Sequence, residues 1–163
     1  MESSAARSPT RALRTIAVLV IVVGVVFAVA GGFTWFVVRD QLADENITVS
    51  DDADRFAGDP VNGPFTAYAE ANTIERHALE ASDGLTYAEL EQDDPRRDTV
   101  MTASFLRASL FTSIVAFGVA AFAMGVGLIL VVLGVALLRI HRQLDDRVAP
   151  ALALTAAHAA PGP

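Results

Sequence analysis

What this sequence lacks removes several classes of function. It contains no cysteine among its 163 residues, which excludes disulfide bridges, thiolate metal sites and cysteine nucleophiles. It contains no lysine either, so all twelve basic residues are arginine. The net charge is −7, and a chain without a basic surplus is a poor candidate for binding nucleic acid.

Two long segments lack any charged residue, and they determine the architecture. Residues 108–138 form a run of 31 residues without Asp, Glu, Lys, Arg or His. As a helix this run would be roughly 46 Å long, whereas the hydrocarbon core of a bilayer is about 30 Å thick. Residues 16–38 form a second uncharged run of 23 residues, long enough to span with modest tilt. We therefore predict an all-α membrane protein with transmembrane helices at 15–38 and 107–138.

Acidic and basic residues are divided unevenly between the remaining segments. Residues 39–106 hold sixteen acidic residues and five Arg, a net charge of −11, whereas 1–14 and 139–163 together hold six Arg and three acidic residues. Arginine beside a membrane span favours the cytoplasmic side. The distribution predicts a plasma-membrane protein with two antiparallel helices, both termini in the cytoplasm, and 39–106 as an acidic extracytoplasmic domain.

The first uncharged run also allows a different interpretation. The small residues Ala28-Val29-Ala30 before Gly31 resemble a cleavage site, and 16–27 has the length of a signal-peptide core. The run continues through Trp35 and Val38, beyond that site, which favours a retained helix. Either alternative exports the middle segment and leaves the second run as a membrane anchor.

The ends of both runs carry residues typical of a membrane interface. We expect Trp35, Arg39, Arg107 and Arg139 to act as interface anchors, because amphipathic aromatic rings and long basic side chains prefer this region. Arg107 has two alternatives, since it can extend to the interface or pair with an acidic residue of the loop.

Turn and capping signals predict a small, mostly helical extracytoplasmic domain. We expect a short helix at 51–56, an amphipathic helix at 65–81 stopped by Gly84, and a capping box formed by Thr86 and Glu89. The long second helix would begin at 94–95 or at Asp98. The large apolar residues available for a core are Phe56, Phe65, Tyr68, Ile74, Leu79, Leu85, Tyr87 and Leu90. A core that small is marginal, so the domain should rest on the spans or on a partner.

The two chain ends have few apolar residues at regular spacing. Residues 1–14 are polar and contain Ser and Pro, and 148–163 are rich in Ala and Pro. We expect the first to be a disordered cytoplasmic tail, and 139–163 to be a charged helical stub followed by a flexible tail.

Small residues at helical spacing predict close helix packing. Glycine and alanine allow two helices to approach each other in lipid, where packing replaces the hydrophobic driving force. The candidate packing residues are Gly24, Ala28, Gly32, Ala121 and Gly125. The favoured interpretation is a hairpin within one chain, and homo-oligomerisation is the alternative.

No arrangement of residues indicates catalysis or transport. His77 falls on the extracytoplasmic side of the predicted topology, whereas His141 and His158 fall on the cytoplasmic side, so they cannot hold one metal. The acidic cluster at 51–54 lacks the Gly and the distant Glu of a calcium loop. Neither run contains the internal ionisable group that a proton or ion pathway requires. We expect no catalytic, cofactor or metal residue, and no cofactor.

The middle segment resembles a family of small actinobacterial two-span membrane proteins often named aromatic ring-opening dioxygenases. The likeness covers residues 40–125 and is carried by Asp52-Ala53, Phe56-Ala57-Gly58, Val61, Gly63-Pro64-Phe65-Thr66-Ala67-Tyr68-Ala69, His77, Thr86-Tyr87-Ala88-Glu89-Leu90 and Thr99-Val100-Met101-Thr102-Ala103-Ser104-Phe105-Leu106-Arg107-Ala108-Ser109-Leu110-Phe111. The family name implies iron held by clustered His and acidic ligands, which this sequence does not offer. We therefore treat the enzymatic name as transferred, and the family as one without established chemistry.

These observations predict a non-catalytic integral membrane protein. The leading interpretation is an accessory or scaffold component of a membrane complex, whose partners are the bilayer and an unidentified membrane protein. Phe65, Tyr68, His77 and Tyr87 are the candidate partner surface. The alternatives are an outward-facing sensor of a ligand or cation, and the dioxygenase that the family name implies.

Overall fold

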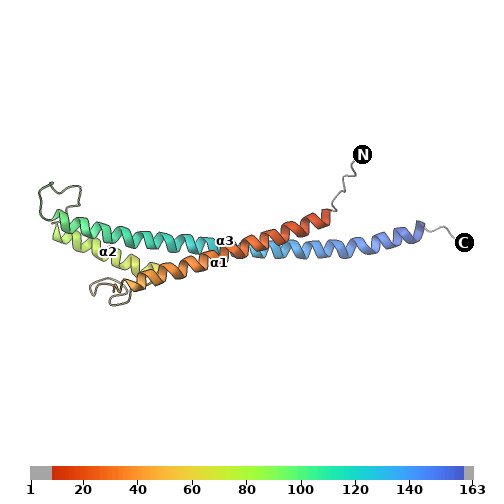
Figure 1. Ribbon diagram of the computed structural model, residues 1–163, viewed down its shortest axis with the longest axis horizontal. Coiled ribbons are helices and arrows are strands. Elements are labelled where there is room, and N and C mark those ends of the chain that lie inside the picture. Colours follow the sequence, from red (N-terminus) through yellow and green to blue (C-terminus); the bar gives the residue numbers. More distant parts are fainter. Residues whose placement is uncertain (1–8, 160–163) are drawn as a thin grey trace. The chain divides into compact units, whose positions relative to one another are not determined.

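Three helices account for most of the chain. The computed structural model describes residues 9–159, and the side chains of residues 12–143. The helices are α1 (Pro9–Asp44), α2 (Pro64–Ala81) and α3 (Arg97–Ala159), and no strand occurs among the described residues. The expected all-α class is therefore confirmed for this part of the chain (Figure 1).

The chain divides into two compact units, and α1 and α3 contribute to both. The described part of the paired-helix unit is residues 9–29 and 123–159, and the loop-bearing unit is residues 30–122. Only the loop-bearing unit contains α2, which lies alongside the first part of α3 (Figure 1).

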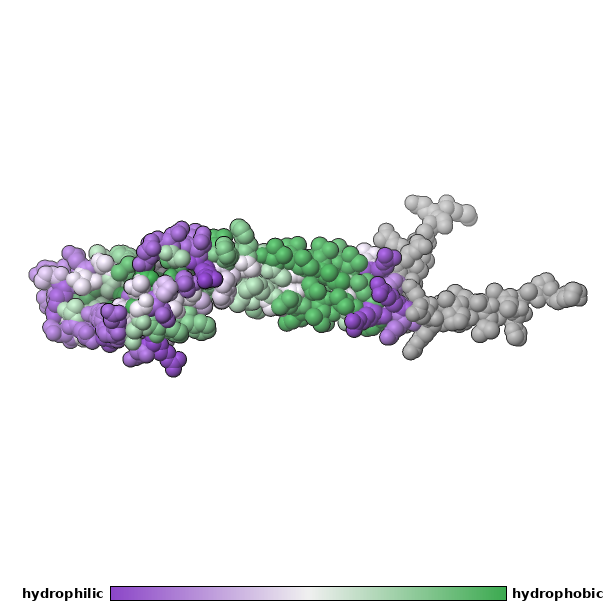
Figure 2. All heavy atoms as spheres, turned by 90° about the horizontal axis from the view of Figure 1, so that it is seen from below, coloured by the Kyte–Doolittle hydropathy of each residue, from purple (hydrophilic) through white to green (hydrophobic). Residues whose placement is uncertain are grey.

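Both α1 and α3 are long and apolar enough to cross a membrane. The candidate spans run from Ala12 to Asp44 and from Arg97 to Gln143, and only 17% and 11% of their most apolar windows are buried. A core helix of a soluble protein would be mostly buried, whereas hydrophobic side chains cover the surface of the paired-helix unit (Figure 2). Exposed apolar surface on this scale is typical of helices solvated by lipid.

The helices extend further toward both chain ends than the sequence suggests. α1 begins at Pro9, where proline fits the first helical position, so residues 9–14 are helical and not a disordered tail. α3 continues to Ala159, so the expected flexible tail at 148–159 is also wrong. Alanine dominates this segment and favours a helix strongly. The rest of both predicted tails, 1–8 and 160–163, lies outside the described residues.

The loop between α1 and α2 is a turn stabilised by backbone pairing. Thr48 and Pro60 form an antiparallel bridge, and Val61 N–H donates to Ile47 O over 2.8 Å. The segment 51–56 forms turns, so the short helix expected there is wrong. Phe56 adopts a positive φ of 62°, a conformation rare for an aromatic residue, and its side chain is 43% exposed.

α2 ends at Ala81 as predicted and begins at Pro64, one residue before the predicted start. Pro64 occupies the start of the helix, where its missing N–H costs nothing. The helix ends at Ala81, and Gly84 follows with a positive φ of 82° while its N–H donates to Leu79 O over 2.7 Å. Glycine is suited to this left-handed turn because it has no Cβ.

The core of the loop-bearing unit draws residues from α1, the loop, α2 and α3. Its buried members are Leu42, Val49, Val61, Ala67, Ala71, Leu110 and Phe117. Of the eight residues expected to form the core, only Leu90 is buried, while Phe65 is 75% exposed. Ala67 and Ala71 of α2 are fully buried in this cluster, where their small side chains allow close packing of the helix. The loop therefore rests on the ends of α1 and α3, as a small core requires.

Residues 82–96 connect α2 to α3 through side-chain caps. Glu89 accepts hydrogen bonds from Thr86 N–H and Thr86 Oγ at 2.8 and 2.7 Å, which is the predicted capping box. Asp94 accepts from the Arg96 backbone and guanidinium, and this pairing lowers the pKa of Asp94 to about 2. α3 then begins at Arg97, with Asp98 in its first turn.

Candidate functional site

The closest helix contact in the paired-helix unit is made by glycines. A methyl group on Gly127 would lie 2.5 Å from Gly24 O and 2.6 Å from Ala28 N. A methyl group on Gly134 would lie 2.9 Å from Ala17 O. The Cβ atoms of other residues essentially never lie within 3.0 Å of non-bonded backbone atoms, so only glycine fits at both positions. We call these five residues the glycine contact.

The glycine contact follows a seven-residue spacing. Ala17 and Gly24 on α1 are seven residues apart, as are Gly127 and Gly134 on α3. Residues at this spacing lie on one face of a helix. Gly24 and Ala28, four residues apart on α1, both approach Gly127.

Some of the predicted packing residues lie where α1 and α3 contact each other, and others lie on open surface. Gly24 and Ala28 lie in the glycine contact, and Gly32 is half-buried. Ala121 is exposed, and a methyl group on Gly125 would meet nothing within 4 Å. The α3 glycines that approach α1 within the chain are therefore Gly127 and Gly134 rather than Gly125.

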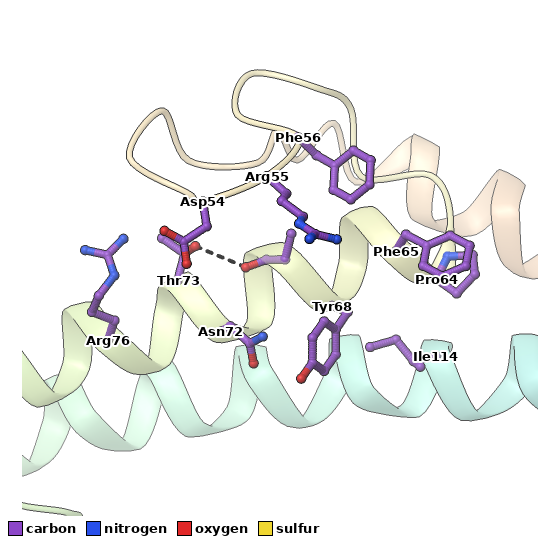
Figure 3. Close-up of a pocket in the computed structure, with 11 residues that line it drawn as sticks. Asp54, Arg55, Phe56, Pro64, Phe65, Tyr68, Asn72, Thr73, Arg76 and Ile114 are labelled. Carbon is purple, nitrogen blue, oxygen red and sulfur yellow. Dashed lines mark hydrogen bonds between the residues drawn. The ribbon is translucent and has the colours of Figure 1, made fainter.

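A cleft of about 710 Å³ opens between α2, the 45–63 loop and α3 in the loop-bearing unit. We call it the α2 cleft. Its apolar residues are Phe56, Pro64, Phe65, Tyr68, Ala69 and Ile114, and its polar residues are Asp54, Arg55, Asn72, Thr73 and Arg76. Figure 3 shows the apolar side chains gathered at the Pro64 end of α2 and Asp54, Thr73 and Arg76 toward the other end. The volume is within the range of small-molecule sites.

Two charged residues of the α2 cleft have no partner among the described residues. Arg55 and Asp54 make no hydrogen bond or ion pair with the part of the chain that the structure describes. Arg76, by contrast, donates to Asp52 Oδ2 over 2.9 Å and to Glu80 over 3.5 Å. Among the residues that the structure describes, Arg55 and Asp54 are therefore the cation and the anion of the cleft that remain available to a ligand.

Asp52 connects the loop to α2 at the edge of the cleft. His77 Nε2 lies 2.7 Å from Asp52 Oδ2, and the same oxygen accepts from Arg76. The hydrogen bond with His77 and then that with Arg76 lower the pKa of Asp52 to about 2. Asp52 is thus ionised at neutral pH and is the partner of His77. The carboxylate of Asp52 is already occupied and not open to a cation.

The buried carboxylate of Glu70 on α2 binds the 45–63 loop through hydrogen bonds. Glu70 is 7% exposed, and it accepts hydrogen bonds from Ser50 N–H at 2.7 Å and from Ser50 Oγ at 3.1 Å. Twenty residues separate the two, so no local spacing in the sequence signals this contact. Glu70 fixes the start of the loop that forms one wall of the α2 cleft.

The four predicted anchors have different environments. Trp35 packs edge-on against Phe117, with ring centroids 4.7 Å apart. Arg107 forms an ion pair with Glu75 of α2 over 2.6 Å, which is the second of its two predicted alternatives. Arg39 and Arg139 are exposed.

The candidate partner residues do not form one surface. Phe65 and Tyr68 line the α2 cleft and are 75% and 52% exposed. His77 is bound to Asp52, and Tyr87 lies beneath Arg97, whose guanidinium carbon is 4.0 Å from the ring centre. Sequence reasoning missed Asp54 and Arg55 as cleft residues, because only the folded loop brings them over α2.

The donors present do not fit the iron that the family name implies. A non-haem iron site requires two His and a carboxylate converging on one point. His77 is adjacent to the carboxylate of Asp52, but no group of three metal-ligating side chains occurs among the residues that the structure describes.

Comparisons with protein-family models, with curated proteins and with solved structures found no match to this chain.

Proposed function

We propose that this chain is a non-catalytic plasma-membrane protein that acts as an accessory or scaffold component of a membrane complex. In this proposal α1 and α3 cross the bilayer as an antiparallel hairpin, and both termini lie in the cytoplasm. Residues 39–106 form an acidic extracytoplasmic domain that meets the partner.

The order of the helix contacts supports the antiparallel hairpin. The early residue Ala17 of α1 approaches the late residue Gly134 of α3, whereas the later Gly24 approaches the earlier Gly127. The excess of acidic residues in 39–106 and the arginines of both flanks support the orientation.

The scaffold proposal rests on two exposed aromatic side chains, Phe65 and Tyr68, that project from the packed helix α2. Phe65 is 75% exposed and Tyr68 is 52% exposed, yet both project from α2, which packs through Ala67 and Ala71 on the helix ends. Exposed aromatic residues on a rigid element are typical of binding hot spots, because little side-chain entropy is lost on association.

Copurification of the full-length chain tests this proposal. After extraction in mild detergent, we expect mass spectrometry to find the same protein partner in each preparation, and Phe65→Ser to remove it. Phe105→Ser is the control, because Phe105 is 67% exposed but does not line the cleft. A monomer without a reproducible partner, or equal loss from both variants, would contradict the scaffold role.

A second candidate is an outward-facing ligand binder, favoured by the unpaired Arg55 and Asp54 in the α2 cleft. A ligand that binds only the folded domain raises its unfolding temperature. The dioxygenase implied by the resemblance requires a ligand set that the donors described above do not supply, so we do not propose it.

A further inference from the structure

The α2 cleft is graded from apolar to charged along a single direction. Pro64, Phe65 and Ile114 are at one end, and Thr73 and Arg76 are at the other, two to three helical turns further along α2. The guanidinium of Arg55 extends over the middle, and Asp54 lies above Thr73 (Figure 3). A molecule lying in the cleft would therefore meet apolar residues first, then a cation, then an anion.

The apolar end of the cleft lies at the edge of the predicted span. Ile114 belongs to the uncharged run 108–138, and it lines the cleft together with Phe65. The Tyr68 and Phe111 rings are 6.2 Å apart, and Glu75 further along α2 pairs with Arg107, so the start of α2 faces the beginning of the uncharged run of α3 and its later part faces the residues before that run. In the proposed orientation, the apolar end opens at the depth of lipid and the charged end opens toward water.

The charges at the other end match a zwitterionic headgroup. Arg55 offers a free guanidinium, whose planar set of donors suits a phosphate, and Asp54 offers a free carboxylate further from the membrane edge. A lipid of this kind has its acyl chain, phosphate and ammonium group in this order. Phe65, Arg55 and Asp54 follow one another in the same order along the cleft.

We propose that the α2 cleft binds one phospholipid of the outer leaflet whose headgroup carries a primary ammonium group, as in phosphatidylethanolamine. Its acyl chain lies against Phe56, Phe65 and Ile114, and its phosphate accepts hydrogen bonds from Arg55. Its ammonium group donates to Asp54. This inference depends on the proposed orientation of the hairpin, and it does not require the scaffold role.

Native mass spectrometry of the full-length protein, with each lipid added separately, tests the proposal. The probes are phosphatidylethanolamine, phosphatidylglycerol and phosphatidylcholine, which share the phosphate but differ in the group beyond it. We expect retention of phosphatidylethanolamine above the other two. Arg55→Ala should weaken its retention by about tenfold, as expected for loss of one charge-assisted contact. Asp54→Asn should remove the preference over phosphatidylglycerol.

The matched control is Arg39→Ala, which removes another exposed arginine that does not line the α2 cleft. It should leave the preference for phosphatidylethanolamine over the other two lipids unchanged. Arg55 and Asp54 bond to no other described residue, so their variants should fold, and the fluorescence of Trp35, the only tryptophan, checks this. Equal retention of all three lipids, or equal loss in Arg39→Ala and Arg55→Ala, means a general lipid annulus and overturns the proposal.

The lipid proposal and the scaffold proposal can fail independently of each other. Loss of the protein partner in Arg55→Ala, without any retained lipid, would mean that a protein segment fills the cleft, and it would overturn the lipid proposal alone. Retained phosphatidylethanolamine without a protein partner would support the lipid site and contradict the scaffold.

Discussion

Replacing Gly127 with valine should force α1 and α3 apart, whereas the same change at Gly125 should leave them in place. The first carbon of the new side chain at Gly127 would lie 2.5 Å from Gly24 O and 3.0 Å from Ala28 Cα. These are backbone atoms, which cannot rotate away, so the helices themselves must move. Overpacking of this kind typically costs about 1–3 kcal/mol.

Gly125 is the matched control for this prediction. It lies two residues away on the same helix and in the same unit, and a carbon added there would meet nothing within 4 Å. Because the chain has no cysteine, spin labels can be attached at Val18→Cys and Leu133→Cys, both at exposed positions. We expect the distance between labels to lengthen and broaden in Gly127→Val only. An unchanged distance in Gly127→Val would show that the glycine contact is not required.

Replacing Glu70 with alanine should release the 45–63 loop from α2. The buried carboxylate accepts both hydrogen bonds of Ser50, and its removal leaves the Ser50 N–H without a partner. Loss of one partner of a buried hydrogen bond typically costs about 1–3 kcal/mol. Glu70→Gln keeps an acceptor in place and should cost less.

Glu80→Ala is the comparison for Glu70→Ala, because Glu80 is on the same helix but its side chain is 64% exposed. It pairs with Arg76 across one helical turn, and such pairs contribute little. Thermal unfolding followed by the fluorescence of Trp35, together with hydrogen exchange at the Ser50 amide, measures both effects. Similar unfolding temperatures for Glu70→Ala and Glu80→Ala would contradict the role assigned to Glu70.

The helices were predictable because their signals are local or continuous. Two uncharged runs locate much of α1 and about half of α3, and Pro64 with Gly84 brackets α2. The Thr86 and Glu89 capping box needs only a three-residue spacing. Each of these signals can be read without knowledge of which segments meet in the folded chain.

The contacts between segments were less predictable. Small residues are abundant in both runs, so their spacing alone did not distinguish Gly127 and Gly134 from Ala121 and Gly125. The pairing of Thr48 with Pro60 places Asp54 and Arg55 above α2, and it depends on a turn without a regular pattern. The α2 cleft therefore could not be assembled from the sequence.

Labelling of single cysteines in intact cells tests the central claim most directly, namely that two spans hold residues 39–106 outside and both ends inside. The natural chain has no cysteine, so a membrane-impermeant maleimide has no background within it. We predict that Gln92→Cys is labelled in intact cells, and that Ser3→Cys and Gln143→Cys are labelled only after the membrane is permeabilised. Labelling of Gln143→Cys in intact cells, or recovery of the protein in the soluble fraction without detergent, would contradict the account.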